Sequence, residues 1–140
     1  MEYRRFSAGY VLRLDPGDEV VECLTRLTRE EDIALASVTG LGAARDVTVG
    51  LFSVEEKKFY AKRCQGEYEI SALVGNMTRK DGEPYLHVHI TFGSPAKGEV
   101  YAGHLTSCVI SATAEIFVQV WEGEVGRSFS QEIGLNLLEF

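Results

Sequence analysis

Hydrophobic and polar residues alternate along most of this chain, with a period of two that is typical of β-strands. The pattern predicts strands over Tyr3–Leu14, Ile33–Val38, Val47–Phe52, Lys57–Cys64, Tyr68–Met77, Leu86–Phe92, Val100–Leu105 and Cys108–Gly123. Helical spacing occurs early, where Val20, Cys23, Leu24 and Leu27 are three or four residues apart. Acidic residues precede this stretch and arginines follow it, as the helix dipole favours, so we expect one helix packed on the sheet.

Turn-forming residues separate the predicted strands. They include Asp15-Pro16-Gly17, Gly40-Leu41-Gly42, Gln65-Gly66-Glu67, Asp81-Gly82 and Ser94-Pro95-Ala96-Lys97-Gly98. One early helix with seven of these strands after it indicates an α+β fold, with an antiparallel-rich sheet of about seven strands and residues 1–140 in a single domain. A single helix excludes a doubly wound α/β fold. Gly40-Leu41-Gly42 does not fit a phosphate-binding loop, because no helical pattern follows it.

The charge balance bears on the partners of the protein. The chain has 14 Lys and Arg against 21 Asp and Glu, a formal net charge of -7. This disfavours DNA, since phosphate contacts from clustered basic residues supply most nucleic-acid affinity. The first ten residues lack the apolar core of a signal peptide, and nowhere do about 18 apolar residues run together. We therefore expect a cytoplasmic protein that does not enter a membrane.

Two further features bear on chemistry and association. The cysteines at 23, 64 and 108 are odd in number and lack metal-ligand spacing, so we expect buried, inert thiols in a reducing compartment. The end of the chain, Phe129–Phe140, is too apolar to remain in water. We expect it to dock on its own subunit or on a neighbouring one.

All three histidines lie between residues 86 and 105. His87 and His89 alternate with apolar residues, so both imidazoles lie on one face of a strand. The turn at 94–98 and the strand after it would bring His104 back beside them. Three imidazoles facing one point suit zinc or another divalent transition metal, such as nickel, copper or iron(II).

Three imidazoles leave a fourth position on such an ion for a water molecule, which zinc can acidify. A metal-dependent enzyme is therefore an alternative to a binding module. Glu115 is the better candidate for a catalytic base and Glu99 the weaker one. The alternative role of such a carboxylate is to orient a ligand imidazole by a hydrogen bond.

The sequence resembles the PPC family, the "plants and prokaryotes conserved" domain. The resemblance covers most of the chain and rests on four stretches. They are Tyr10–Leu14 with Gly17-Asp18-Glu19, Ala36–Ala43, Gly66–Asn76, and Leu86-His87-Val88-His89 with Gly103-His104-Leu105. In similar prokaryotic proteins three histidines in this pattern bind a metal, usually taken as zinc, and the domain forms a homotrimer. The resemblance implies that His87, His89 and His104 are the ligands here.

The family resemblance also raises alternatives. Plant relatives join the domain to AT-hook segments that grip DNA, and there the domain contacts other proteins. This chain contains no Arg-Gly-Arg-Pro core, so the DNA-binding description of the family has little support in its residues. A second protein remains a further expected partner. A cupin also combines His-x-His with a later histidine, but its motif has a glutamate soon afterwards and residues 90–96 contain no carboxylate.

Overall fold

The computed structural model describes all 140 residues, and it contains eight strands and one helix. The elements in chain order are β1 Glu2–Phe6, β2 Gly9–Leu14, α1 Val20–Glu30, β3 Ala36–Ser53, β4 Lys58–Lys80, β5 Glu83–Ser94, β6 Glu99–Val120, β7 Gly126–Ser130 and β8 Leu135–Glu139. The predicted α+β class with one helix is confirmed, although there is one strand more than the expected seven.

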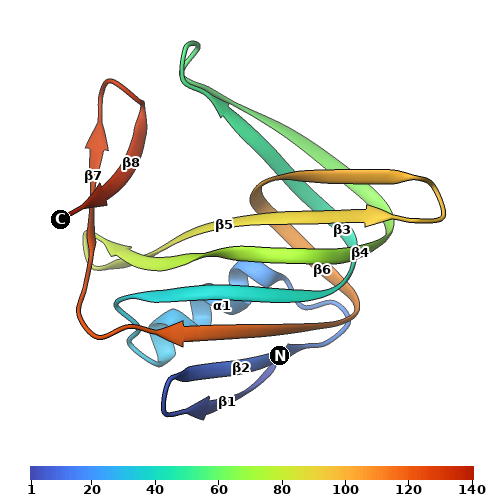
Figure 1. Cartoon of the computed structure of the whole chain (residues 1–140), viewed down its shortest axis with the longest axis horizontal. Helices are drawn as coiled ribbons and strands as arrows, with labels where there is room; N and C mark the ends of the chain where they lie inside the picture. The colour runs from blue at the N-terminus through green and yellow to red at the C-terminus, as the bar shows by residue number, and fades with distance from the viewer.

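Six strands form the main sheet in the order β1-β2-β6-β3-β4-β5, and all of their pairings are antiparallel. The start of β6 also pairs with the end of β5, so β3, β4, β5 and β6 form a closed circuit. Figure 1 shows how β6 runs beside β5 and then bends to lie between β2 and β3. The bend separates β6 from β5 immediately after the pair His89 and His104.

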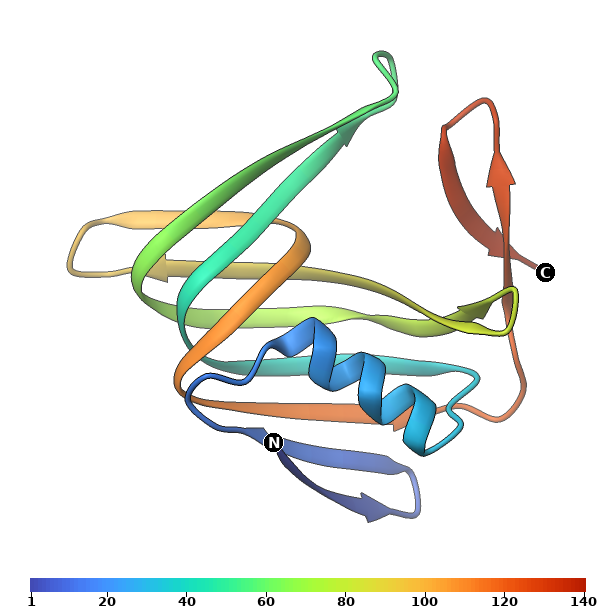
Figure 2. The same cartoon turned by 180° about the vertical axis from the view of Figure 1, so that it is seen from behind.

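The helix α1 covers one face of the sheet, as Figure 2 shows. Its buried side is made by Val20, Cys23, Leu24, Leu27 and Thr28, which includes all four residues of the predicted apolar face. Glu19 caps the N-terminus, because its carboxylate accepts a hydrogen bond from the Glu22 amide at 2.7 Å. The other carboxylate oxygen of Glu19 accepts from the Cys108 amide, also at 2.7 Å, and so ties the helix to β6. At 11 residues, α1 is too short to cross a membrane.

Three predicted strand boundaries were wrong. Tyr3–Leu14 is a hairpin, since the chain reverses at Ser7-Ala8 and Phe6 pairs with Gly9. The glycines at 40, 42 and 66 do not end strands: β3 and β4 run through them, and register shifts between Gly40 and Gly42 let β3 bend. A side chain at Gly42 would put its Cβ 2.5 Å from the Thr113 carbonyl oxygen, so glycine here permits close strand approach.

The fourth difference concerns β6. The sequence predicts two strands, Val100–Leu105 and Cys108–Gly123, but one strand spans Glu99–Val120 with a register shift opposite Thr48 and Val49. An irregularity of this kind inserts a residue without ending the strand, and alternation alone cannot distinguish it from a loop.

Two hairpins project from the sheet (Figures 1 and 2). One is the turn between β3 and β4 with its flanking residues, 51–60, which we call the β3–β4 arm. The other is the C-terminal hairpin, β7 with β8. They touch at their tips, where the Lys57 ammonium donates to the Glu132 carbonyl. The apolar tail therefore does meet its own subunit, but Phe129 and Phe140 stay exposed.

Candidate metal site

The three histidines meet where β5 and β6 separate. His89 and His104 are direct partners across the β5–β6 ladder, and His87 is two residues before His89 on β5. Residues two apart on a strand face the same side, and directly paired residues share a face. The structure therefore brings together the three histidines that the sequence selects.

Their geometry fits a small ion. The ring centroids are 5.2 Å apart for His87 and His89, 5.5 Å for His87 and His104, and 5.6 Å for His89 and His104. One nitrogen from each ring lies within 4.8 Å of the others. A tetrahedral zinc ion with Zn–N bonds near 2.0–2.1 Å needs nitrogens roughly 3.4 Å apart, so modest side-chain rotations would close the set.

Solvent reaches the group from one side. His87 and His89 are exposed and His104 is half-buried, so small molecules can reach the imidazoles. Burial nevertheless lowers the pKa of His87, with further lowering by His104, His89 and Arg127. Burial and then His89 lower the pKa of His104 as well. Both imidazoles are therefore neutral at neutral pH, which is the form that binds metal.

An aromatic ring from the β3–β4 arm forms one wall. Phe59 meets the His104 ring edge to face, at 5.9 Å between centroids and 86° between planes. Gly50 is the β3 partner of His104, and a Cβ at Gly50 would lie 2.4 Å from Cζ of Phe59. The absence of a side chain at Gly50 thus lets Phe59 hold the orientation of His104.

An apolar hollow of about 350 Å³ adjoins His104 where β5 and β6 separate. Its other lining residues are Val21, Phe59, Leu86, Val88, Leu105 and Thr106. The hollow contains no charged side chain. Any chemistry in this region therefore depends on the imidazoles.

A cluster of polar residues next to His87 was not predicted from the sequence. Asn76 on β4 is the direct partner of His87, and Thr78 is the partner of Tyr85 two residues before it. Arg127 of β7 donates to the Asn76 side-chain oxygen and to the Thr78 hydroxyl, each at 2.8 Å. Arg127 is 49 residues from Thr78 and 51 from Asn76 in the sequence, so no local pattern could indicate these two contacts.

The two glutamates proposed from the sequence are not brought to the histidines. Glu115 lies on β6 opposite Arg13 and Leu41, eleven residues beyond His104. Glu99 lies at the other end of the β5–β6 pairing, opposite Ser94. The one group of at least three metal-ligating side chains consists of His87, His89 and His104 alone, without a carboxylate.

The three cysteines take no part in the site. All are buried and none forms a disulfide, as predicted. Burial raises the pKa of the Cys108 thiol to about 12. A thiol with this pKa stays protonated at neutral pH and is a poor nucleophile and ligand.

Solved structures share this fold over nearly its whole length. A candidate DNA-binding protein from Bacteroides thetaiotaomicron is 29% identical, with a TM-score of 0.95 over 99% of this chain and 96% of the other. A metal-containing protein from Archaeoglobus fulgidus is 31% identical, with a TM-score of 0.86 over the full length of both chains.

A curated protein is related over part of its length. The bifunctional protein GlmU of Synechococcus sp. (strain JA-2-3B'a(2-13)) is 33% identical over 109 residues, 76% of this chain. The match spans only 16% of that protein. The sequence profile of the Plants and Prokaryotes Conserved (PCC) domain, the family called PPC above, matches residues 1–122. This chain therefore belongs to the Plants and Prokaryotes Conserved domain family.

Proposed function

We propose that this protein is a metal-binding, homotrimeric module that serves regulation or contacts with other proteins, and that zinc is its ion. The observation that carries the metal proposal is the meeting of His87, His89 and His104 within 4.8 Å on two adjacent strands. His87, His89 and His104 would hold the ion. The metal-containing relative from Archaeoglobus fulgidus supports this proposal.

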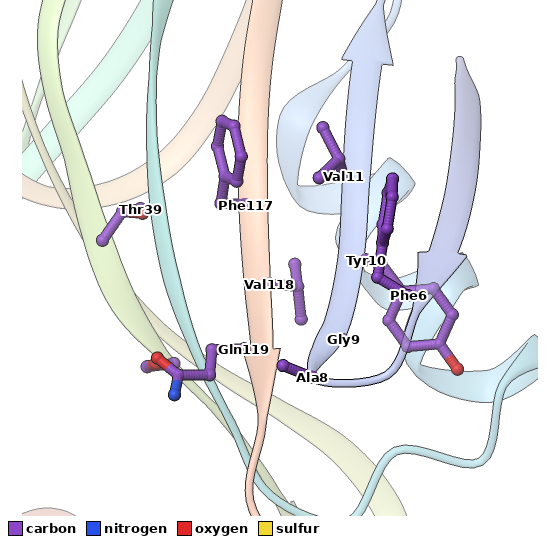
Figure 3. Close-up of a pocket in the computed structure, with 10 residues that line it drawn as sticks. Phe6, Ala8, Gly9, Tyr10, Val11, Thr39, Phe117, Val118 and Gln119 are labelled. Carbon is purple, nitrogen blue, oxygen red and sulfur yellow. The ribbon is translucent and has the colours of Figure 1, made fainter.

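Exposed apolar surface supports the homotrimer. The outer face of β2 and β6, opposite α1, has a hollow of about 330 Å³ lined by Phe6, Ala8, Gly9, Tyr10, Val11, Ser37, Thr39, Phe117, Val118 and Gln119 (Figure 3). Phe117 is 55% exposed on this face, and Phe129 is 61% exposed on the C-terminal hairpin. Surfaces of this kind are typical of subunit interfaces. The number of subunits is taken from the family resemblance.

A metal-dependent enzyme is the second candidate function. It is favoured by the exposure of two of the three histidines and by the absence of a fourth ligand-bearing side chain from the group. A bound zinc ion would supply Lewis acidity and an acidified water. Glu115 is too far along β6 to serve as the base, so water or substrate itself would have to take that part.

Metal content of substituted protein tests the proposed site. We expect His87→Ala and His104→Ala each to lower the zinc content of natively purified, untagged protein at least roughly tenfold, because two imidazoles bind zinc much more weakly than three. Elemental analysis measures the content, and circular dichroism verifies folding. Lys97→Ala, an exposed substitution in the turn between β5 and β6 that lies outside the group and outside the apolar hollow, is the control. Full zinc content in the His87→Ala/His104→Ala double variant would refute the site.

A further inference from the structure

Arg127 carries the only guanidinium that reaches the neighbourhood of the histidines from the C-terminal hairpin. Its Nε donates to the Thr78 hydroxyl and one Nη donates to the Asn76 oxygen, both at 2.8 Å. The other Nη donates to the Asn136 carbonyl at 3.1 Å, within the hairpin. The guanidinium carbon also lies 4.3 Å from the centre of the Tyr85 ring.

These contacts place the charge beside His87. Asn76 is paired with His87, and Thr78 is paired with Tyr85. Tyr85 and His87 are two residues apart on β5 and share a face, a separation of roughly 6.6 Å along a strand.

No carboxylate neutralises this charge. The partners of Arg127 are an amide, a hydroxyl, a carbonyl and an aromatic ring, and it forms no ion pair. By contrast, two arginines on β4 of the main sheet are paired with acids, Arg63 with Asp46 and Arg79 with Asp32. Arg127 is half-buried, and a guanidinium keeps its charge in proteins, so the field of this cation is only partly screened by solvent.

We propose that the three-histidine site takes a small anion, such as a carboxylate, as its ligand and that the charge of Arg127 strengthens this selectivity. The inference rests on the proposed metal binding, since a metal ion would supply the contact and Arg127 the selection by charge. Imidazole ligands would leave the charge of a divalent ion uncompensated, and the Arg127 guanidinium adds one more positive charge, so the site would favour an anion over a neutral ligand.

The competing explanation is that Arg127 has a structural role alone. Its hydrogen bonds to Asn76 and Thr78 anchor the C-terminal hairpin to β4. Charge and anchoring can be separated by two substitutions. Arg127→Gln removes the charge and shortens the side chain, whereas Arg127→Lys keeps the charge and loses the planar fork. Arg63→Gln, which removes an arginine on β4 that is paired with Asp46, is the matched control.

The experiment uses untagged full-length protein loaded with Co²⁺, because cobalt occupies zinc sites and its visible absorption reports the ligands around it. Each protein is titrated with acetate, inorganic phosphate and imidazole at pH 8. We expect Arg127→Gln to bind acetate about 5- to 10-fold more weakly than the unsubstituted protein does, a loss reduced by solvent screening at this partly open site. Arg127→Lys and Arg63→Gln should retain acetate affinity within about twofold, and neutral imidazole should bind equally to all four proteins.

Three results would overturn the proposal while metal binding stands. The first is unchanged affinity for both acetate and phosphate in Arg127→Gln. The second is a loss of imidazole affinity equal to the loss of acetate affinity, which would indicate distortion by a released hairpin. The third is equal weakening of acetate binding by Arg127→Gln and by the control Arg63→Gln. Absence of cobalt absorption in the unsubstituted protein would refute the metal site itself, and this inference with it.

Discussion

At the scale of single residues, the histidines combine metal-binding capacity with a perturbed protonation equilibrium. Burial lowers the pKa of His87 and of His104 below the ordinary value of 6.5. Partial removal from water penalises the imidazolium, and like charges that would gather on the three rings add to the penalty. The lowered pKa values favour neutral His87 and His104, the form that coordinates a metal.

This equilibrium predicts the pH dependence of metal binding. A proton and a metal compete for the same ring nitrogens, so lowered pKa values keep the site competent to a lower pH than free imidazole would allow. We expect bound zinc to be stable from pH 7 to about 6.5 and to be released as the pH falls further through the lowered pKa values of His87 and His104. A fluorescent zinc indicator that works in acid measures the release. Loss of metal as the pH is raised from 6.5 to 8 would contradict the assignment.

The folding stability of the metal-free protein should also decrease as the pH falls. Folding lowers the pKa values of His87 and His104, so below about pH 6.5 the unfolded chain binds more protons than the folded chain does. The free energy of unfolding therefore decreases as the pH falls through this range. His104→Ala, which removes one of these groups, should flatten the dependence. Urea denaturation between pH 7 and pH 5 measures it, with the exposed substitution Lys97→Ala as the control.

At the scale of secondary structure elements, one glutamate joins the helix to the sheet. Glu19 accepts from the Glu22 amide at the N-terminus of α1 and from the Cys108 amide on β6. Both bonds involve a carboxylate and backbone N–H groups, a pairing stronger than one between neutral groups. Helical spacing in the sequence identified the apolar face of α1, but only the fold shows that its cap is also a tertiary contact.

We therefore expect Glu19→Ala to lower the free energy of unfolding by about 1–3 kcal/mol, since it removes the cap and leaves the Cys108 amide without a partner. Chemical denaturation followed by circular dichroism measures this difference. Glu22→Ala, an exposed residue in the first turn whose side chain caps nothing, should cost less than about 1 kcal/mol. Equal effects of the two substitutions would mean that the double role of Glu19 adds no stability.

At the scale of the whole molecule, apolar side chains remain on the outside of the sheet and on both projecting hairpins. Phe117, Leu51 and Phe129 are each more than half exposed. A two-stranded hairpin such as β7–β8 is marginal by itself, and here it contacts its own subunit mainly through Arg127 and its tip. These surfaces are suited to association with further copies of the chain.

Light scattering should accordingly give three times the chain mass of 15.5 kDa at micromolar concentration. Phe117→Lys, which puts a charge on the apolar outer face of β6, should shift the mass towards the monomer. Val100→Lys, at an apolar residue with 75% exposure beside the β5–β6 turn, is the control and should leave the mass unchanged. A monomer mass for the unsubstituted protein would contradict the proposed trimer.

The distribution of charge predicts weak DNA binding. The chain is acidic overall, and Arg5, Arg13, Arg29, Arg63, Arg79 and Lys80 are already paired with carboxylates. We expect a mobility-shift titration with AT-rich duplex to show no more binding than an unrelated acidic protein gives at physiological salt. Salt-sensitive binding at submicromolar protein, weakened by substitution of Arg4 or Lys57, would establish DNA as a ligand instead.

The sequence by itself determined those features that depend on neighbouring residues. A period of two placed His87 and His89 on one face, and a five-residue turn returned His104 to them, because strand geometry and short turns are local properties. Helical spacing likewise identified α1. The strand ends at Gly40, Gly66 and Ser107 were misjudged, since glycines and bulges that bend a strand resemble those that end it.

Only the tertiary structure decided what surrounds the histidines. Phe59 reaches His104 from the β3–β4 arm, and Arg127 reaches the neighbourhood of His87 from β7, whereas Glu115 is carried away along β6. These outcomes depend on the register between strands distant in sequence and on the bends that close β3, β4, β5 and β6 into a circuit. Register and bending arise from packing over the whole sheet, so no stretch of sequence contains them by itself.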